Sequence, residues 1–90
     1  DNIIRIEAEG GYSHFYMKDG QKVLSSKNIK EYEDILPANM FIRVHNSHII
    51  SLACIIKYHR GRGGLIEMED GQMIEVASRR KEKFLAAISG

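Results

Sequence analysis

The residues best suited to chemistry in this 90-residue chain lie together in one ten-residue segment. From Phe41 to Ile50 the sequence reads FIRVHNSHII, which contains one Arg, two His, one Asn and one Ser between apolar residues at both ends. These polar side chains donate or accept the hydrogen bonds that are made to phosphates and to base edges. The apolar residues can anchor the segment in a core. We therefore expect a strand that leads into a rigid polar bend at the protein surface.

Signatures of catalysis or of a metal site do not occur in the sequence. There is no HExxH motif, no cysteine pair and no Walker-type phosphate loop, and the GRGG run at 61–64 lacks the strand-to-helix context of a dinucleotide site. His45 and His48 could share a metal ion, but no third ligand with suitable spacing accompanies them. Cys54 lies in an apolar run, which favours a small buried hydrophobe over a nucleophile. We expect no enzyme, no metal and no cofactor.

Basic residues are unevenly distributed, although the net charge is only +1. Residues 1–40 contain 5 Lys/Arg and 7 Asp/Glu, whereas residues 41–90 contain 8 and 5. The basic side chains of the second half form two groups: Lys57, Arg60 and Arg62 beside His59, and Arg79, Arg80, Lys81 and Lys83. If the fold brings both groups to one surface, they form a phosphate-binding face. For either group alone, solvated loops without a partner are the simpler interpretation.

Length and composition indicate one small globular domain. Hydrophobic residues make up 43% of the chain and charged residues 28%, and no apolar run reaches the roughly 18 residues of a membrane span. A single cysteine cannot form an internal disulfide, which favours a reducing cytoplasm. The chain begins at Asp1 without a Met or a signal peptide, so we expect a domain from a longer protein.

The pattern of apolar and turn residues predicts a mostly β fold. Expected strands cover 3–8, 12–17, 21–25, 41–45, 53–59, 65–69 and 72–76, with hairpin turns at Asp19-Gly20 and Asp70-Gly71. A helix over 29–36 is expected, with Ser26 or Asn28 as its N-cap and Pro37 as the residue that stops it. Residues 46–51 are expected to form the bend and a short apolar anchor. Ser78 is expected to cap a closing helix over 79–89.

Motifs spread along the whole chain resemble the LytTR DNA-binding domain of bacterial response regulators. The resemblance covers four segments: Ile6 to Tyr12, the helix that ends in Leu36-Pro37, the signature Phe41 to Ile50, and Asp70-Gly71 followed by Val76 to Arg80. The signature together with a Ser-Arg-Arg close at this spacing is specific. One departure is Ser51, where the family often has Asn; Ser can bond the local turn more weakly.

The resemblance implies elongated antiparallel β-sheets packed together, with one or two short helices beside them. It also implies that loops, rather than a recognition helix, enter successive major grooves of DNA. A loop tip on a stiff sheet can present an Arg or Asn to a base edge as well as a helix can.

Four residues are expected to contact bases by this resemblance: Asn46, Arg80, Arg79 and His14. Asn46 stands in the signature bend, and Arg80 matches an arginine that reaches a base in the family, with Arg79 beside it. The loop after the first strand offers Tyr12, Ser13 or His14, of which His14 is our choice, although strand alternation could equally bury it.

Seven residues are expected to contact phosphates: Arg43, His45, Lys57, Arg60, Arg62, Lys81 and Lys83. We expect His45 also to brace the bend, and Arg43 to meet either a phosphate or a carboxylate within the fold. The loop from Tyr58 to Gly64 either follows the phosphates or is a solvated turn. Both alternatives stay open, because the charges favour the first and the glycines make such a loop costly to order.

The expected function is sequence-specific binding of double-stranded DNA in transcriptional regulation, as the output domain of a two-component response regulator. Residues 1–90 would be its C-terminal part, active as a homodimer on repeated sites in a promoter. The alternative is a small β protein-interaction module whose basic face binds an acidic partner.

Overall fold

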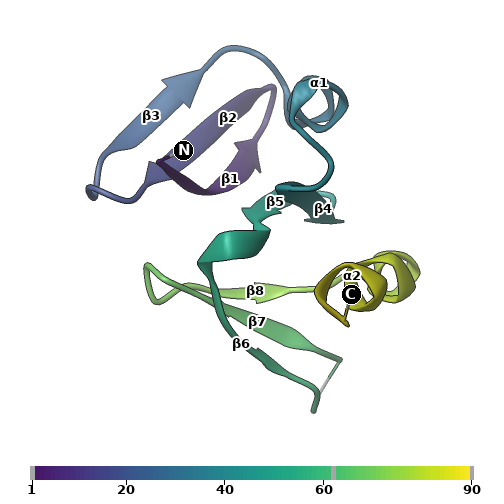
Figure 1. Cartoon of the computed structure of the whole chain (residues 1–90). Coiled ribbons are helices and arrows are strands. Elements are labelled where there is room, and N and C mark those ends of the chain that lie inside the picture. Colours follow the sequence, from purple (N-terminus) through teal and green to yellow (C-terminus); the bar gives the residue numbers. More distant parts are fainter. Residues whose placement is uncertain (1, 62, 90) are drawn as a thin grey trace.

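Two antiparallel sheets and two helices form the domain, whose computed structural model describes residues 2–61 and 63–89 (Figure 1). The elements are β1 (Ile3–Glu9), β2 (Tyr12–Met17), β3 (Lys22–Ser25), α1 (Ile29–Ile35), β4 (Phe41–His45), β5 (His48–Ser51), the 3₁₀ turn η1 (Leu52–Cys54), β6 (Ile55–His59), β7 (Leu65–Met68), β8 (Met73–Glu75), the 3₁₀ turn η2 (Ser78–Arg80) and α2 (Lys81–Ser89). The first sheet has the order β3-β2-β1-β5-β4 and the second the order β6-β7-β8. The mostly β fold expected from the sequence is confirmed, with a longest dimension of 33 Å against 25 and 23 Å.

Strands β4 and β5 are buried on both faces of the first sheet, because α1 covers one face and the second sheet with α2 covers the other. Ile42, Val44 and Ile50 belong to the core that joins the two sheets. Phe41 and Ile49 belong to a smaller core beneath α1. Side chains of a strand point alternately to its two faces, so this hairpin supplies both cores with apolar groups.

The two core clusters hold most of the buried apolar side chains. The core between the sheets consists of Ile4, Ile42, Val44, Ile50, Cys54, Ile66, Met68, Ile74, Val76 and Phe84, and the core beneath α1 of Ile6, Ile29, Phe41 and Ile49. Cys54 is fully buried, as the sequence predicts for a small hydrophobe. Phe84 attaches α2 to the second sheet, where its ring meets that of Tyr58 edge-on at 5.2 Å.

Three local predictions were wrong. Residues 48–51 are a strand between β1 and β4 and not an anchor after a bend, because the short apolar run pairs on both sides. The expected strand over 53–59 begins at Ile55, because η1 turns the chain from the first sheet to the second. Ser78 makes no capping hydrogen bond; it begins η2, whose N-cap is Ala77, and α2 continues from there. Asn28, in contrast, caps α1 in a reciprocal pair with Glu31, as one of the two expected alternatives.

A buried ion-pair cluster joins the two sheets away from both helices. Arg5 on β1 donates from Nε to Asp70 Oδ2 at 2.8 Å and from Nη1 to Glu7 Oε1 at 3.0 Å. Its guanidinium lies 3.7 Å from the centre of the Tyr16 ring. Only 5% of the Arg5 side chain is exposed. Since Asp70 lies in the β7–β8 turn, this Arg5 cluster (Arg5, Glu7, Tyr16 and Asp70) fixes one sheet against the other.

Candidate nucleic-acid interface

Three turns that are distant in the sequence lie at one end of the first sheet. The β1–β2 turn and the β4–β5 turn meet there because the Ala8 amide donates to the Ser47 carbonyl at 2.8 Å. The Ala77 amide, just before η2, donates to the Val44 carbonyl at 2.8 Å. The fold therefore gathers the polar bend, the loop after the first strand and the segment that leads into the closing arginines at one end of the first sheet.

Asn46 occupies the tip of the β4–β5 turn and is exposed. Its backbone carbonyl is bonded from within the fold: Arg43 Nη2 donates to it at 2.7 Å. Arg43 Nε donates to the neighbouring carbonyl of His45 at 2.9 Å. The turn is thus held from below by its own strand, while the Asn46 side chain stands at the surface.

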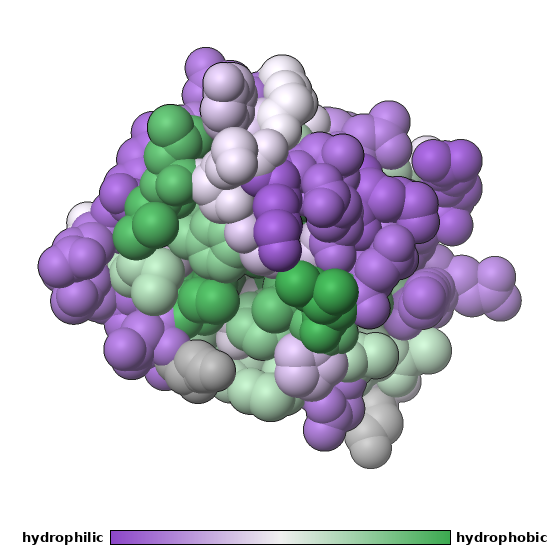
Figure 2. Space-filling model, turned by 90° about the horizontal axis from the view of Figure 1, so that it is seen from above, coloured by the Kyte–Doolittle hydropathy of each residue, from purple (hydrophilic) through white to green (hydrophobic). Residues whose placement is uncertain are grey.

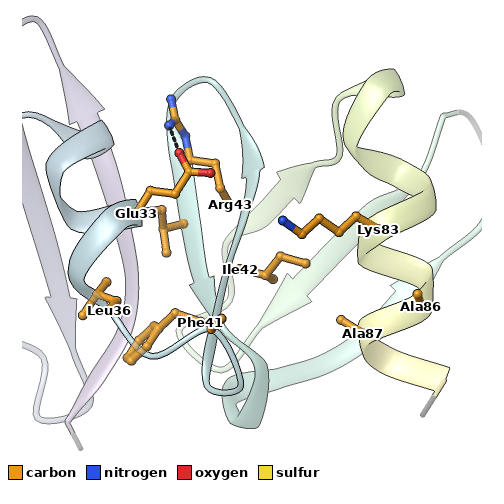
Figure 3. A pocket seen from close by; sticks show the side chains of 10 residues that line it. Glu33, Leu36, Phe41, Ile42, Arg43, Lys83, Ala86 and Ala87 are labelled. Carbon is orange, nitrogen blue, oxygen red and sulfur yellow. Dashed lines mark hydrogen bonds and ion pairs between the residues drawn. The ribbon is translucent and has the colours of Figure 1, made fainter.

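We expected Arg43 to meet either a phosphate or a carboxylate within the fold, and in the structure it meets a carboxylate. Its Nη1 lies 2.6 Å from Glu33 Oε1 on α1, and each of its three nitrogens has a partner within the fold. Only 10% of its side chain is exposed. Charge-assisted bonds of this length are among the stronger ones in proteins. Arg43 therefore braces the turn from inside, as Figure 3 shows for its pair with Glu33.

Arg80 reaches the same carboxylate from the other side. Its Nη1 lies 3.6 Å from Glu33 Oε2, and its Nε is buried without a hydrogen-bond partner among the described residues. This brings Asn46 and Arg80 to one place through two intervening residues, and we call Glu33, Arg43, Asn46 and Arg80 the Arg43 cluster. Arg79 is exposed on η2 beside it.

The two histidines of the signature behave differently. His45 Nδ1 accepts the Ser47 amide at 3.1 Å, so this side chain braces the turn, as the sequence led us to expect. His48 is half-buried, its ring centre lies 5.5 Å from that of His45, and its Nδ1 is buried without a partner among residues 2–61 and 63–89. Burial lowers the pKa of His48 from its usual 6.5, and the nearby His45 and Arg5 add to this, whereas Glu7 opposes it.

In the β1–β2 region the structure distinguishes the three candidates. Tyr12 is 53% exposed, whereas Ser13 is fully buried and donates to the Lys27 carbonyl at 2.8 Å. His14 is largely buried, and its Nε2 lies 2.6 Å from Glu9 Oε1. Of the three candidates, Tyr12 is therefore the one whose side chain is exposed, while His14 is engaged by the exposed carboxylate of Glu9.

The other basic residues predicted to contact phosphates lie on β6, on the loop after it and on α2. Lys57 and Arg60 are exposed on β6 and directly after it, Lys83 is exposed on α2, and Lys81 is half-buried at the start of that helix. Arg62, which we expected to contact phosphate, lies outside the described residues. Gly64 anchors the far side of this loop: its φ is +88°, and a Cβ there would overlap the Tyr58 hydroxyl. Its carbonyl accepts the Val76 amide at 3.3 Å, so the loop is attached to the segment that leads into η2.

A groove lies between the two helices, over the outer strand β4 (Figure 3). Its volume is about 320 Å³, and its lining includes Phe41, Ile42, Leu36 and Ala87, with Glu33, Arg43 and Lys83 at its polar side. Figure 2 shows one face of the domain, on which hydrophilic and hydrophobic side chains lie in separate patches.

No group of three or more His, Cys, Asp or Glu among the described residues is placed to hold a metal. None of the helices in that part of the chain is long and apolar enough to cross a membrane.

Comparison with known families shows which family the chain belongs to. The family model of the LytTr DNA-binding domain matches residues 1–89. The chain belongs to the LytTR family. The resemblance inferred from the signature and the Ser-Arg-Arg close is thereby confirmed, and the chain is a DNA-binding domain of this type.

Two relatives agree with this assignment. The chain is 28% identical over 91 residues to the heme-containing CO-sensing transcriptional regulator RcoM 2 of Paraburkholderia xenovorans (strain LB400), a match that covers 99% of the chain and 34% of that protein. It thus spans about a third of the length of this curated relative. The solved LytTr DNA-binding domain of a putative methyl-accepting/DNA response regulator from Bacillus cereus has the same fold, with a TM-score of 0.88 at 20% identity over 99% of this chain and 83% of that one.

Glu33 is the residue of the site that sequence reasoning missed. In the sequence it is one of several charges on an amphipathic helix, and a solvated position is the usual interpretation of such a charge. A usable signal is that Glu33 adjoins Tyr32 on the apolar side of α1, where a carboxylate needs a partner once the helix packs.

Proposed function

We propose that this domain binds double-stranded DNA with sequence preference and regulates transcription in the bacterial cytoplasm, as the output domain of a two-component response regulator. The observation that carries the proposal is the Arg43 cluster, which places Asn46 and Arg80 at one end of a rigid sheet in a chain that belongs to a DNA-binding family. An exposed Asn and a nearby Arg are the side chains that pair with adenine and guanine in the major groove.

The proposal divides the basic face into two sets with different tasks. Asn46 and Arg80, with Arg79 beside them, read base edges, and Tyr12 takes the place that the sequence suggested for His14 because Tyr12 is the exposed residue of its turn. The other set supplies salt-dependent attraction to phosphates and consists of Lys57, Arg60, Arg62, Lys81 and Lys83. His45 and Arg43 brace the β4–β5 turn rather than contacting DNA themselves.

Dimer formation on two repeated sites follows from the small size of the interface. A single module of this kind offers less contact area than specific promoter binding commonly uses, so a second copy raises both affinity and site selectivity. In a response regulator, a receiver domain N-terminal to residues 1–90 would promote this dimer. The similar domain from Bacillus cereus comes from a putative response regulator, which agrees with this context.

A second context has support from the curated relative. RcoM 2 is named as a CO-sensing regulator, and the chain matches one third of it. A LytTR domain joined to a sensor domain in one polypeptide would use the same DNA-binding surface with a different input. The two contexts differ in the domain that would be joined to the DNA-binding domain: a phosphoacceptor receiver in the first and a ligand sensor in the second.

Two alanine variants test the division of labour. Sites are first selected from random duplexes with the wild-type domain, and binding to the selected site and to random DNA is then measured by fluorescence anisotropy at fixed salt. Arg80→Ala should lower the preference for the selected site by roughly 5- to 150-fold, the loss of one bidentate base contact. Lys81→Ala should weaken both complexes alike and reduce the slope of log K against log salt by about 1.

Two outcomes would refute this function. Equal effects of both variants on selected and random DNA would show that the arginine reads no base. Retention of the wild-type domain on an acidic polymer, with no binding to duplex DNA of equal charge, would show a protein-interaction module instead.

A further inference from the structure

Resting on the DNA-binding function proposed above, we propose that Glu33 is a positioning residue that sets the sequence preference of the domain without touching DNA. The Glu33 carboxylate on α1 joins Arg43 and Arg80 and so fixes the distance between the Asn46 turn and η2.

The geometry of the Glu33 carboxylate provides the first argument. Each of its oxygens faces a different arginine: Oε1 lies 2.6 Å from Arg43 Nη1, and Oε2 lies 3.6 Å from Arg80 Nη1. The two arginines come from segments 37 residues apart in the sequence, β4 and η2. One carboxylate therefore couples the two elements that the proposed function assigns to base reading.

The link that Glu33 makes to Arg43 continues from Arg43 to the tip of the β4–β5 turn. Arg43 holds the carbonyls of both His45 and Asn46 through its Nε and Nη2. A shift of Arg43 would move both carbonyls, and with them the direction of the Asn46 side chain. Productive base contacts tolerate displacements of only about 0.5 Å, so the anchoring of this arginine matters for preference.

Arg80 is held less firmly than Arg43. Its pair with Glu33 is longer than a hydrogen bond, and its buried Nε has no partner among the described residues. The side chain is thus oriented by charge rather than locked by several bonds, which leaves its outer nitrogens able to turn to a base. Loss of the Glu33 charge would leave this orientation undefined.

The test compares Glu33→Gln with Asp34→Asn. Both remove one negative charge from the same helix with almost no change of shape, but Asp34 is exposed and, among the described residues, pairs with Lys30 alone, at 3.5 Å. The binding sites are those selected by the wild-type domain, and affinity for the selected site and for random duplex is measured at two salt concentrations. Thermal unfolding of each variant confirms that it is folded under these conditions.

Glu33→Gln should lower the preference for the selected site about tenfold, within the range of one base contact, and change binding to random DNA little. Asp34→Asn should leave the preference unchanged. In an Arg80→Ala background, Glu33→Gln should cost much less preference, because one of the two positioned groups is already gone. Glu33→Asp keeps the charge but shortens the side chain, so it should lower the preference for the selected site to a smaller extent. This variant replaces Glu33→Gln in the test if Glu33→Gln does not fold.

Three outcomes overturn the inference. An unchanged preference in Glu33→Gln, with a lower unfolding temperature, would make Glu33 structural only. Equally tighter binding to all DNA in both charge-removal variants would make it a general repulsive charge. An undiminished effect in the Arg80→Ala background would separate Glu33 from that arginine. If the wild-type domain itself shows no preference, the proposed function fails, and this result is recognised before any variant is measured.

Discussion

The Arg5 cluster and the Arg43 cluster use the same chemistry in two regions of the molecule and do different things with it. In each, an arginine on a strand of the first sheet pairs with a carboxylate from an element outside that sheet. The Arg5 guanidinium is closed in by Glu7, Asp70 and the Tyr16 ring. The Arg43 cluster extends instead to an exposed turn and to Arg80. An internal ion pair thus fixes one sheet on the other in the first region and, in our proposal, orients a DNA-binding surface in the second.

We predict that the Arg5 cluster contributes to stability but not to DNA preference. A substitution of Arg5 should therefore change the free energy of unfolding more than any other substitution that we propose. Arg5→Met keeps the apolar stem but leaves two carboxylates without their cation. Removing one partner of a buried pair costs about 3–5 kcal/mol, and we expect about 2–3 kcal/mol because both carboxylates retain some exposure. For a domain of this size, the unfolding temperature should fall by roughly 10–20 °C.

Urea or thermal unfolding measures this effect, and Lys30→Met is the control. Lys30 makes an exposed pair with Asp34, so its loss should cost less than about 0.5 kcal/mol. The folded Arg5→Met protein should keep the wild-type preference for its selected DNA site. A loss of preference without a loss of stability would contradict the assignment of the two clusters.

The opposite behaviour is expected of Asn46 in the Arg43 cluster. Arg43 bonds the backbone carbonyl of Asn46, which alanine also has, so Asn46→Ala should change the free energy of unfolding by less than about 0.5 kcal/mol. The preference for the selected site should fall by about 1–3 kcal/mol if the amide reads a base. Denaturant titration and anisotropy on selected and random duplexes measure the two quantities. A destabilised Asn46→Ala with unchanged preference would reverse the comparison.

A smaller effect is expected from pH, through a histidine that lies between the two clusters. His48 pairs along β5 with Glu7 on one side and with His45 on the other. Because burial lowers its folded-state pKa below 6.5, the unfolded chain takes up this proton first as the pH falls. Stability is therefore complete above about pH 6.5 and declines below it, until the folded pKa is reached.

One proton limits the slope of this decline to about 1.4 kcal/mol per pH unit. His48→Gln removes the titrating group, so its stability should depend less on pH than that of the wild type, over a range of about 7.5 to 5.5. Denaturation curves at several pH values test the difference between the two proteins. A wild type that becomes more stable as the solution is acidified through this range, with the difference lost in the variant, would show that the sign of the shift is wrong.

Local sequence patterns predicted the elements better than their partners. Alternating apolar residues and two Asp-Gly turns located most of the strands, and Asn28 marked the start of α1. Strand β5 escaped prediction because four residues carry too little periodicity to distinguish a strand from an anchor. Its place beside β1 depends on pairing between residues far apart in the sequence, such as Arg5 and Ile50, which no short window contains.

The candidate site was predictable in its parts but not in its internal contacts. Asn46, Arg79 and Arg80 were proposed as base-reading residues because the signature and the Ser-Arg-Arg close contain them, and their contacts with bases stay a prediction. The partners of Arg43 and the burial of Ser13 depend on how α1 and the β1–β2 turn pack. The alternation of side chains along a single strand could therefore not predict either of them. The position of Glu33 beside Tyr32 indicates that it needs a partner, but no local feature of the sequence shows that Arg43 is the partner of Glu33 or Arg5 that of Asp70, since each pair forms only in the tertiary structure.

Because β5 is paired on both sides, with β1 and with β4, the proposed DNA-binding surface is protected against part of the thermal fluctuation of the domain. Edge strands and termini open frequently without the rest of a domain, whereas a strand paired on both sides opens last. The Ile49 and Ile50 amides should accordingly exchange with deuterated solvent only through global unfolding. Through β5, the β4–β5 turn is thus attached to a strand that opens late, and partial opening at the far edge strand β3 would leave the shape of the turn intact.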